Sequence, residues 1–370
     1  MTRPRSTLVS VSDTPWYQVV SRCVRRAFLC GSDAHSGQSF EHRRGWIVER
    51  VKQLSGVFAI DVAAYAVMSN HYHLILRIDA ERARSWTRDE VLRRWTQLFD
   101  GPLAVQRLLA GKGDELDAAT HLAIDEWAQK VRARLCDLSW FMRVLNETIA
   151  RKANAEDDVT GRFWEGRFKS QALLDEQAIL TAMVYVDLNP IRAQMAQTPE
   201  DSEHTSVAER INQLKPAAQR QRRKSPTTAP ARSNAAAQQS VSAVATPIVA
   251  LKCETHLAQL PRQPLMPFDA TARLRAAIPF AFDDYLDLVD TTGRCIRPDK
   301  RGAIAGRTPK LLNRLNIDPE HFIDCATNLM KQFGSAVGAP AHLTELCATR
   351  QVKYLRGMTV AKAVFELRAA

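Results

Sequence analysis

Residues 64–78 constrain the fold most strongly, because they predict two β-strands joined by a tight turn. The turn falls at Ser69 and Asn70, a pair suited to a two-residue hairpin between two largely apolar runs. Successive side chains of a strand point to opposite faces of the sheet, so His71 and His73 share one face of the second strand. The segment therefore predicts an antiparallel strand pair that presents two imidazoles on one side.

The two histidines are placed to hold one metal ion between them. Imidazole nitrogen is a common ligand of divalent transition metals, and a strand sets alternate side chains next to each other. A pair of this kind standing alone is more often two exposed strand histidines that bind nothing. The choice between these two interpretations of His71 and His73 depends on a second segment, much further along the chain.

That second segment, residues 175–192, predicts a helix that carries a tyrosine and an asparagine on one face. Asp175 is a good N-cap, and Tyr185 and Asn189 are four residues apart, which makes them neighbours on the helix surface. Pro190 disfavours helical geometry at the residue before it, so we expect this face to end at Asn189. A tyrosine in such a helix is ordinarily a packing residue. The hypothesis here is that Tyr185 is a nucleophile.

Three segments in this order resemble a known family, the single-tyrosine HUH transposases, and most closely its REP-associated tyrosine transposases. They are the His-Tyr-His strand, the Gly-Arg-Phe-Trp-Glu-Gly-Arg-Phe-Lys segment at 161–169, and the Tyr-x-x-x-Asn-Pro-x-Arg segment at 185–192. The resemblance runs from about residue 16 to about residue 195. Two positions depart from the family pattern: Ser69 stands where a proline is frequent, and Gln18 stands where the first strand often has a histidine.

The resemblance implies a transposase of the REP-associated type, which cuts and rejoins DNA with the help of a metal ion. Tyr185 would attack a phosphodiester and keep a 5′-phosphotyrosine bond, leaving a free 3′-hydroxyl on the other strand end. Two imidazoles from His71 and His73 and the amide oxygen of Asn189 would hold the ion, either Mg²⁺ or Mn²⁺. The implied partner is single-stranded DNA with hairpin-forming palindromic repeats. The sequence does not identify the base that accepts the tyrosine proton.

The predicted elements give an α+β fold of the ferredoxin-like HUH type. A strand at residues 16–23, a helix at 39–54 and the strand pair form the strand–helix–strand–strand opening of a ferredoxin-like fold. A helix at residues 131–154 and a strand within 161–173 continue it, giving an antiparallel sheet with helices on its faces. Residues 79–131 are predicted to be a helical insertion.

Composition divides the chain into three parts. Residues 1–213 form the predicted HUH nuclease domain, and we expect them to fold and cut DNA alone. Residues 214–262 are basic and rich in proline and alanine, so they predict a disordered linker. Residues 263–370 predict a small all-helical domain, a DNA-binding accessory that would raise affinity without adding catalysis. Its candidate DNA contacts are Arg294, Arg297, Lys300 and Arg301.

The charge of the chain favours a polyanionic partner. The formal net charge is +11 at pH 7, which is an argument about association and not about fold. Each cation near the predicted site is either a solvated surface charge or a phosphate ligand. The candidate phosphate ligands are Arg22, Arg162, Arg167, Lys169 and Arg192.

Cysteine usage and hydropathy indicate a cytoplasmic protein, and the DNA partner implied by the resemblance would make it nucleoid-associated. The 7 cysteines are scattered without a Cys-x-x-Cys pair, which favours reduced thiols over a disulfide framework or a zinc ribbon. No uncharged apolar run approaches the ~20 residues that span a bilayer, so no membrane partner is expected. The sequence leaves the oligomeric state open between a monomer and a homodimer.

Two other functions remain open at this stage. A catalytically silent, sequence-specific DNA-binding regulator could keep the same fold, although such a protein has no use for His71, His73, Tyr185 and Asn189 together. A phosphodiesterase that uses water could keep the metal site while Tyr185 serves only in packing. A covalent protein–DNA adduct separates the first hypothesis from both of these.

Overall fold

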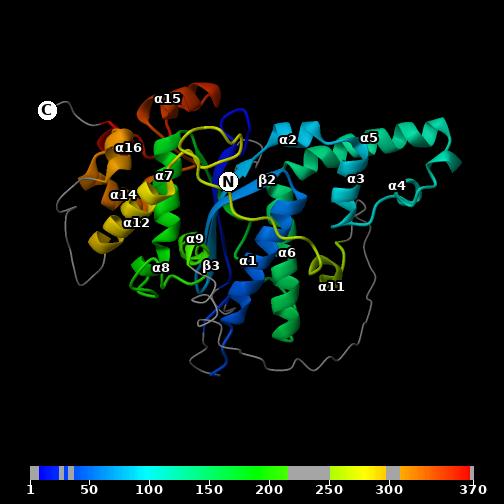
Figure 1. Cartoon of the computed structure of the whole chain (residues 1–370), viewed down its shortest axis with the longest axis horizontal. Helices are drawn as coiled ribbons and strands as arrows, with labels where there is room; N and C mark the ends of the chain where they lie inside the picture. The colour runs from blue at the N-terminus through cyan, green and yellow to red at the C-terminus, as the bar shows by residue number, and fades with distance from the viewer. Residues whose placement is uncertain (1–7, 25–28, 32–36, 216–250, 297–308, 367–370) are drawn as a thin grey trace.

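The computed structural model describes residues 8–24, 29–31, 37–215, 251–296 and 309–366. The centre of the described part is a five-stranded sheet with the strand order β2-β3-β1-β4-β5 (Figure 1). The strands are β1 (Trp16–Arg22), β2 (Ile60–Val67), β3 (His71–Ile78), β4 (Lys169–Leu173) and β5 (Ala336–Val337). The first four pair antiparallel with their neighbours, whereas β5 runs parallel to β4.

The first four strands have ferredoxin-like connections. α1 (His42–Val57) joins β1 to β2, the turn at Ser69 and Asn70 joins β2 to β3, and α6 (Leu138–Glu156) leads into β4. This β-α-β-β-α-β succession, with β1 and β3 at the centre of the sheet, defines the split fold that the sequence predicts. The predicted α+β class and antiparallel sheet are therefore confirmed.

Helices cover both faces of the sheet. α1 and α6 pack together against one face, where the Tyr72 hydroxyl donates a hydrogen bond of 2.6 Å to Asn146 Oδ1 of α6. α7 (Glu176–Asp187) packs against β2, β3 and β4 on the other face, the one that carries His71 and His73. In Figure 1, α7 lies across the strands from α1 and α6.

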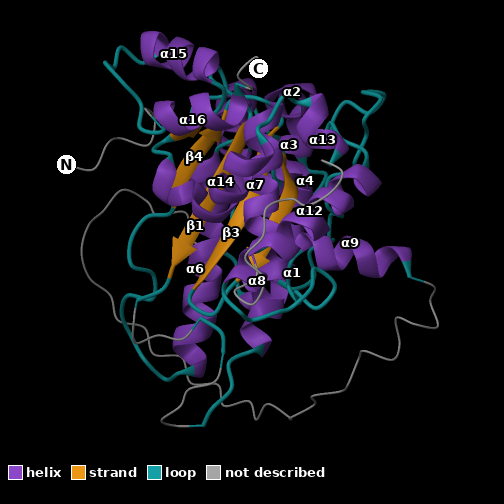
Figure 2. Ribbon diagram, turned by 90° about the vertical axis from the view of Figure 1, so that its left-hand side faces the viewer, coloured by secondary structure: helices purple, strands orange, loops and turns teal. Residues whose placement is uncertain are grey.

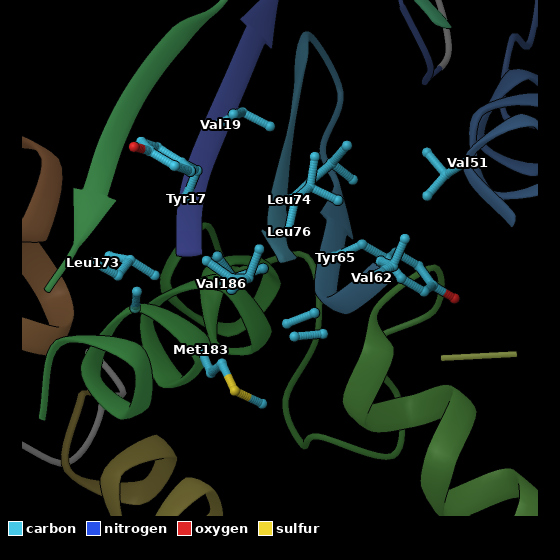
Figure 3. Packing of buried hydrophobic residues seen from close by; sticks show 14 of the residues in the cluster. Tyr17, Val19, Val51, Val62, Tyr65, Leu74, Leu76, Leu173, Met183 and Val186 are labelled. Atoms are coloured by element: carbon cyan, nitrogen blue, oxygen red, sulfur yellow. The ribbon is translucent and has the colours of Figure 1, made fainter. Parts of the chain in front are cut away.

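The helix α7 is buried on every side. All residues from Ala178 to Asp187 are buried, and Figure 3 shows Met183 and Val186 of this helix in the apolar core beside Leu173 of β4. A helix that is apolar all round needs a packing partner on each side. The sheet supplies only one of them.

The second cover of α7 comes from the C-terminal part of the chain. α12 (Phe282–Ile296) and α14 (Pro319–Gln332) pack against α7, and Figure 2 shows both of them near it. Of the predicted helical domain, residues 263–281 contain no helix, whereas the described residues from 282 onward are mainly helical, as predicted, and include the two-residue strand β5. The division into domains at residues 213 and 263 stays a prediction. The shorter helices after α7 are α8 (Asn189–Arg192), α9 (Ser206–Leu214), α11 (Glu254–Leu257), α13 (Lys310–Arg314), α15 (Pro340–Thr349) and α16 (Met358–Phe365).

The last residues of the predicted linker are in contact with the sheet domain. Glu254 of α11 accepts a hydrogen bond of 2.6 Å from the Arg50 guanidinium of α1, so the chain is already docked on α1 before residue 263. The rest of the predicted linker, residues 216–250, lies outside the described residues. So do three of the four proposed accessory DNA contacts, namely Arg297, Lys300 and Arg301.

Residues between β3 and α6 are helical, as predicted for the insertion. They form α2 (Ala80–Ser85), α3 (Arg88–Thr96), α4 (Leu103–Leu109) and α5 (Ala118–Leu135), and in Figure 1 α4 projects away from the sheet. A small apolar cluster of its own, built on Leu92, Val105, Ile124 and Ala128, holds this projection together. Among the described helices, none combines the length and the apolar character that a membrane span requires.

Candidate active site

A cleft of about 330 Å³ lies where β1, β3 and β4 face α7. Six of the nine predicted site residues line it, namely Arg22, His71, His73, Arg167, Lys169 and Tyr185. Val20, Glu165, Gly166 and Met330 complete the lining. The strand register sets Arg22 of β1 beside His71 and Val20 beside His73, so these side chains share the face that α7 covers. The structure thus brings together a tyrosine, two histidines and three cations.

The two imidazoles lie close to each other, and one of them is fully enclosed. The ring centroids of His71 and His73 are 4.9 Å apart. His73 is 2% exposed, and neither of its ring nitrogens has a hydrogen-bond partner within the described part of the chain. Nδ1 of His71 is 2.7 Å from Oδ1 of Asn70, which assigns the proton to Nδ1 and leaves the Nε2 lone pair available.

Both histidines are neutral at pH 7. Burial lowers the pKa of His71 to about 4, with smaller contributions from the positive charges of Arg22 and Arg192. Burial also holds the pKa of His73 well below its ordinary value, and His71 and the same two arginines add to that effect. Neutral imidazole is the form that binds metal ions, so the environment keeps both rings in the ligating state.

The histidine pair fits a divalent metal ion. A buried nitrogen without a partner costs about 1–3 kcal/mol, and a metal ion is the partner that two neighbouring neutral imidazoles suit. Among the described residues, no three His, Cys, Asp or Glu side chains are grouped closely enough to hold an ion by themselves. His71 and His73 would therefore share the ion with amide, phosphate or water oxygens.

Asn189, the predicted third ligand, lies beside the tyrosine but does not line the cleft. It is 2% exposed, its Nδ2 donates a hydrogen bond of 3.1 Å to the Tyr185 carbonyl, and its Oδ1 accepts one from the Arg192 guanidinium. The helix α7 ends at Asp187 and α8 begins at Asn189, so the break comes slightly before the position that Pro190 predicts. A metal-binding role of Asn189 stays a prediction, and it requires Oδ1 to exchange the guanidinium for the ion.

Tyr185 faces the histidines across the cleft. Its ring centroid is 5.4 Å from that of His73, at an interplanar angle of 81°. On its other side, the Arg192 guanidinium carbon lies 4.2 Å from the centre of the tyrosine ring. The side chain is 7% exposed, and no described residue forms a hydrogen bond with its hydroxyl group. The ring is therefore packed on both sides, while its hydroxyl group is not hydrogen-bonded to any residue that the structure describes.

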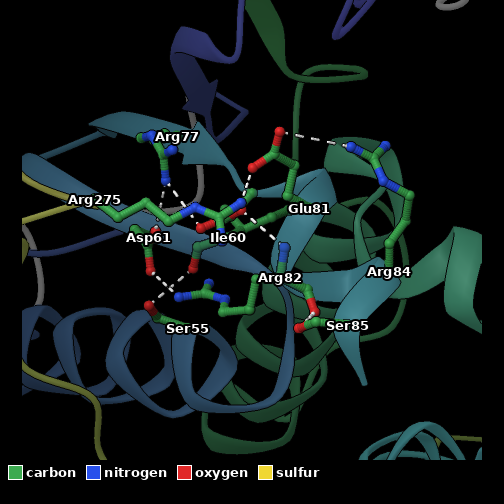
Figure 4. A network of polar contacts seen from close by, with 10 residues as sticks. Ser55, Ile60, Asp61, Arg77, Glu81, Arg82, Arg84, Ser85 and Arg275 are labelled. Carbon is green, nitrogen blue, oxygen red and sulfur yellow. Dashed lines mark hydrogen bonds and ion pairs between the residues drawn. The ribbon is translucent and has the colours of Figure 1, made fainter. Parts of the chain in front are cut away.

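Three cations at the cleft have no anionic partner among the described residues: Arg22, Arg167 and Lys169, all exposed. Arg77 differs from them. It follows the histidines on the same face of β3, but it is bound to Asp79 at 3.1 Å and belongs to the ion-pair network around Asp61 (Figure 4). Cations without partners at a concave site are suited to phosphate groups.

Two predicted phosphate ligands have their guanidinium groups engaged inside the protein. Arg162 donates to the carbonyl oxygens of Trp164 and Glu165, the former at 2.8 Å, and so braces the turn before β4. Arg192 donates to Asn189 and to the Thr327 carbonyl, the latter at 2.7 Å. Neither side chain lines the cleft. Their roles in DNA binding stay predictions.

Sequence reasoning missed several residues around the site. Glu165 is the acidic residue of the cleft lining, and it stands inside the 161–169 segment that carries the family resemblance. Met330 reaches the cleft from α14, which no local pattern indicates. The sequence also did not predict a second pocket of about 290 Å³, which is lined by Arg167, Phe168 and Met142 among other residues.

Gln18, which replaces a frequent histidine of the family pattern, cannot contact DNA in this structure. It is fully buried on β1, between Ile75 of β3 and Gln171 of β4. Neither polar atom of its amide has a partner among the described residues. The position therefore contributes to the sheet interior below α7 and not to the surface of the cleft.

Comparison with known proteins gives one distant structural relationship. No family model and no curated protein matches the sequence. Among solved structures, the chain is similar to a REP-associated tyrosine transposase bound to a REP hairpin, with 12% sequence identity and a TM-score of 0.32. The match covers 54% of this chain and 81% of that chain. A score this low carries no functional argument, so the fold class follows from the strand order and the site from its own geometry.

Proposed function

We propose that this protein cuts and rejoins single-stranded DNA through a covalent bond to Tyr185. The observation that carries the proposal is the convergence in one cleft of Tyr185, the histidine pair and cations that have no anionic partner in the described chain. The three sequence segments that resemble REP-associated tyrosine transposases supply these side chains apart from Arg22, although the segments are far apart in the chain. They also suggest hairpin-forming palindromic repeats as the substrate.

The reaction would be an exchange of one phosphodiester for another. Oη of Tyr185 attacks the phosphorus, the new O–P bond forms and the bond from phosphorus to the 3′-oxygen breaks. The phenol loses its proton and the departing 3′-oxygen gains one, so the step has no net proton release. The product is a 5′-phosphotyrosine and a strand that ends in a 3′-hydroxyl. Because the bond energy is kept in the adduct, a 3′-hydroxyl can later reverse the step and rejoin strands.

Each group of side chains has a role in this scheme. Arg22, Arg167 and Lys169 would hold the phosphates on either side of the reacting one. A divalent ion on His71 and His73 would supply Lewis-acid stabilisation of charge at the phosphate. The rigid packing of the Tyr185 ring limits the rotations that are lost on reaching the attack geometry.

The test is to trap the covalent adduct. The full chain is incubated with Mg²⁺ or Mn²⁺ and a pool of single-stranded oligonucleotides that share a hairpin, have randomised flanks and are labelled at the 3′ end. We expect label on the wild-type protein in a denaturing gel, and none with Tyr185→Phe or with EDTA. Tyr354→Phe is the matched control, because Tyr354 is 80% exposed.

The other outcomes identify the alternative functions. Cleavage by Tyr185→Phe at the wild-type rate, with no label on any protein, would assign a phosphodiesterase that uses water. Hairpin binding by the wild-type chain with no cleavage under either metal would assign a silent DNA-binding regulator.

A further inference from the structure

The C-terminal segment is bound to both ends of α7, the helix that carries Tyr185. At the N-terminal end, Asp175 caps α7 through Oδ1, while its Oδ2 accepts hydrogen bonds from the Ala339 backbone at 2.6 Å and from His342 Nδ1 at 2.8 Å. In the first turn of the helix, Gln177 Nε2 donates to the Leu315 carbonyl at 2.6 Å. The start of α7 is thus fixed by the residue that follows α13, by α15 and by the residue that precedes α15.

The C-terminal end of α7 is fixed by a buried hydrogen bond. Asp187 and Tyr285 of α12 are both fully buried, and the tyrosine hydroxyl donates to Oδ2 of the carboxylate at 2.6 Å. Close beside them, Gly293 of α12 packs on the residues that follow α7. A Cβ at Gly293 would come within 3.2 Å of the Leu188 side chain, so α12 approaches the end of the helix as closely as a glycine permits.

Arg192 extends this connection to the reacting side chain. One of its terminal nitrogens donates to the Thr327 carbonyl of α14, the other donates to Asn189 Oδ1, and its guanidinium carbon lies 4.2 Å from the centre of the Tyr185 ring. The acceptor in α14 lies next to Asn328, where that helix is kinked (φ −120°, ψ 18°). The same helix sends Met330 to the cleft. A single planar group therefore joins α14, the nucleophile and the predicted metal ligand.

We propose that the described residues 282–296 and 309–365 are part of the catalytic unit, and that Arg192 is the positioning residue through which α14 sets the orientation of Tyr185 and Asn189. The proposal rests on the proposed role of Tyr185 as nucleophile. It assigns the C-terminal segment to the reaction step, in contrast to the sequence-based prediction of a DNA-binding accessory. It also assigns the charge of Arg192 to intramolecular contacts, in contrast to the predicted phosphate contact.

The geometry explains why an arginine is needed at this position. A guanidinium presents several N–H donors in a fixed plane, so it can donate to two acceptors and stack on a ring at the same time. A lysine ammonium has the same charge but no planar fork, and it cannot keep the three contacts of Arg192 together. Arg192→Lys therefore keeps the positive charge that attracts phosphate but removes the planar donor group, so it distinguishes a positioning role from a phosphate contact.

The experiment compares Arg192→Lys and Arg192→Gln with Arg167→Gln in the full chain. Three quantities are measured for each variant: the rate of adduct formation at saturating hairpin DNA, the DNA affinity, and the dependence of that affinity on salt. We expect both Arg192 variants to form the adduct about 100-fold more slowly, since a small misplacement of a reacting group has an effect of that size. Their affinity and salt dependence should stay at the wild-type values. Arg167→Gln should instead lower the log–log salt slope by about one unit.

The outcomes separate the proposal from the function on which it rests. If wild type forms no adduct, the proposed function fails. If wild type forms the adduct and Arg192→Lys forms it at a similar rate, the positioning role is wrong. It is also wrong if Arg192→Gln lowers the salt slope of DNA binding as Arg167→Gln does. Amide hydrogen exchange in α7 and α8 gives an independent structural readout: it should become faster in Arg192→Gln and not in Arg167→Gln, whether or not adduct forms. Unchanged exchange would also overturn the proposal. Urea midpoints confirm that each variant is folded.

Discussion

Replacing Tyr285 with phenylalanine tests whether the C-terminal segment and the sheet unfold as one unit. The substitution keeps the buried ring and removes only the hydroxyl group that donates to Asp187 at 2.6 Å. A hydrogen bond to a charged partner contributes about 1.5–3 kcal/mol, and the fully buried carboxylate has no access to water that could replace it. We therefore expect the free energy of unfolding to fall by about 2 kcal/mol.

Tryptophan fluorescence makes this measurement specific. All 7 tryptophans of the chain lie between residues 16 and 164, so urea denaturation followed by fluorescence reports on the sheet and the insertion and not on α12. If the parts unfold together, Tyr285→Phe lowers the fluorescence midpoint without changing the slope m. Tyr354→Phe, at an exposed position, should change the stability by less than about 0.5 kcal/mol. Equal midpoints for Tyr285→Phe and wild type would refute the reasoning and favour independent domains.

Three further predictions concern the cleft and the buried carboxylate. His73→Ala should slow adduct formation by about 100-fold or more at a fixed Mn²⁺ concentration, because it removes half of the imidazole pair. His121→Ala in the insertion is the control and should have no effect. Equal rates for His73→Ala and wild type would exclude the metal site. Arg167→Gln and Lys169→Gln should each lower the log–log salt slope of DNA binding by about one unit, and unchanged slopes would remove them from the interface. Burial raises the pKa of Asp187 above its ordinary 3.8, so its favourable contribution to stability is fully present below that pH and is lost as the pH rises through the folded-state pKa. Asp187→Asn should flatten this decline in urea midpoints measured from about pH 3 to pH 7, and a parallel decline would contradict the assignment.

Local periodicity predicted the face on which each of His71, His73 and Tyr185 lies, whereas the expectation that they form one site came from the family resemblance. The alternation along β3 fixes the shared face of the histidines, and the helical spacing after Asp175 fixes the face of the tyrosine. Both signals are local, and the ferredoxin-like order of elements brings the two faces together. The same periodicity could not show how the guanidinium groups of Arg162 and Arg192 are used. An arginine near a site can turn outward to a phosphate or inward to a carbonyl, and this choice depends on contacts far away in the sequence.

The docking of the C-terminal segment is also a non-local property, but the sequence contains a signal for it. From Ala178 to Val186 the chain is apolar at almost every position, whereas a helix with one solvent face shows polar residues at helical spacing. Such a helix needs a second packing partner besides the sheet. The composition of residues 1–213 offers no obvious one, and the structure supplies it with α12 and α14. Neither the face of α14 that packs against α7 nor the position of the Met330 side chain in the cleft could be predicted without the fold.

Mapping the covalent adduct tests the central claim most directly. The full chain is treated with hairpin DNA labelled at the 3′ end, digested with trypsin and nuclease, and analysed by mass spectrometry. Cleavage after Lys169 and Arg192 releases residues 170–192 as one peptide, whose single tyrosine is Tyr185. We predict that this peptide carries the nucleotide mass and that fragmentation places it on Tyr185. DNA cleavage with no modified peptide, or with the modification on another residue, would contradict the account.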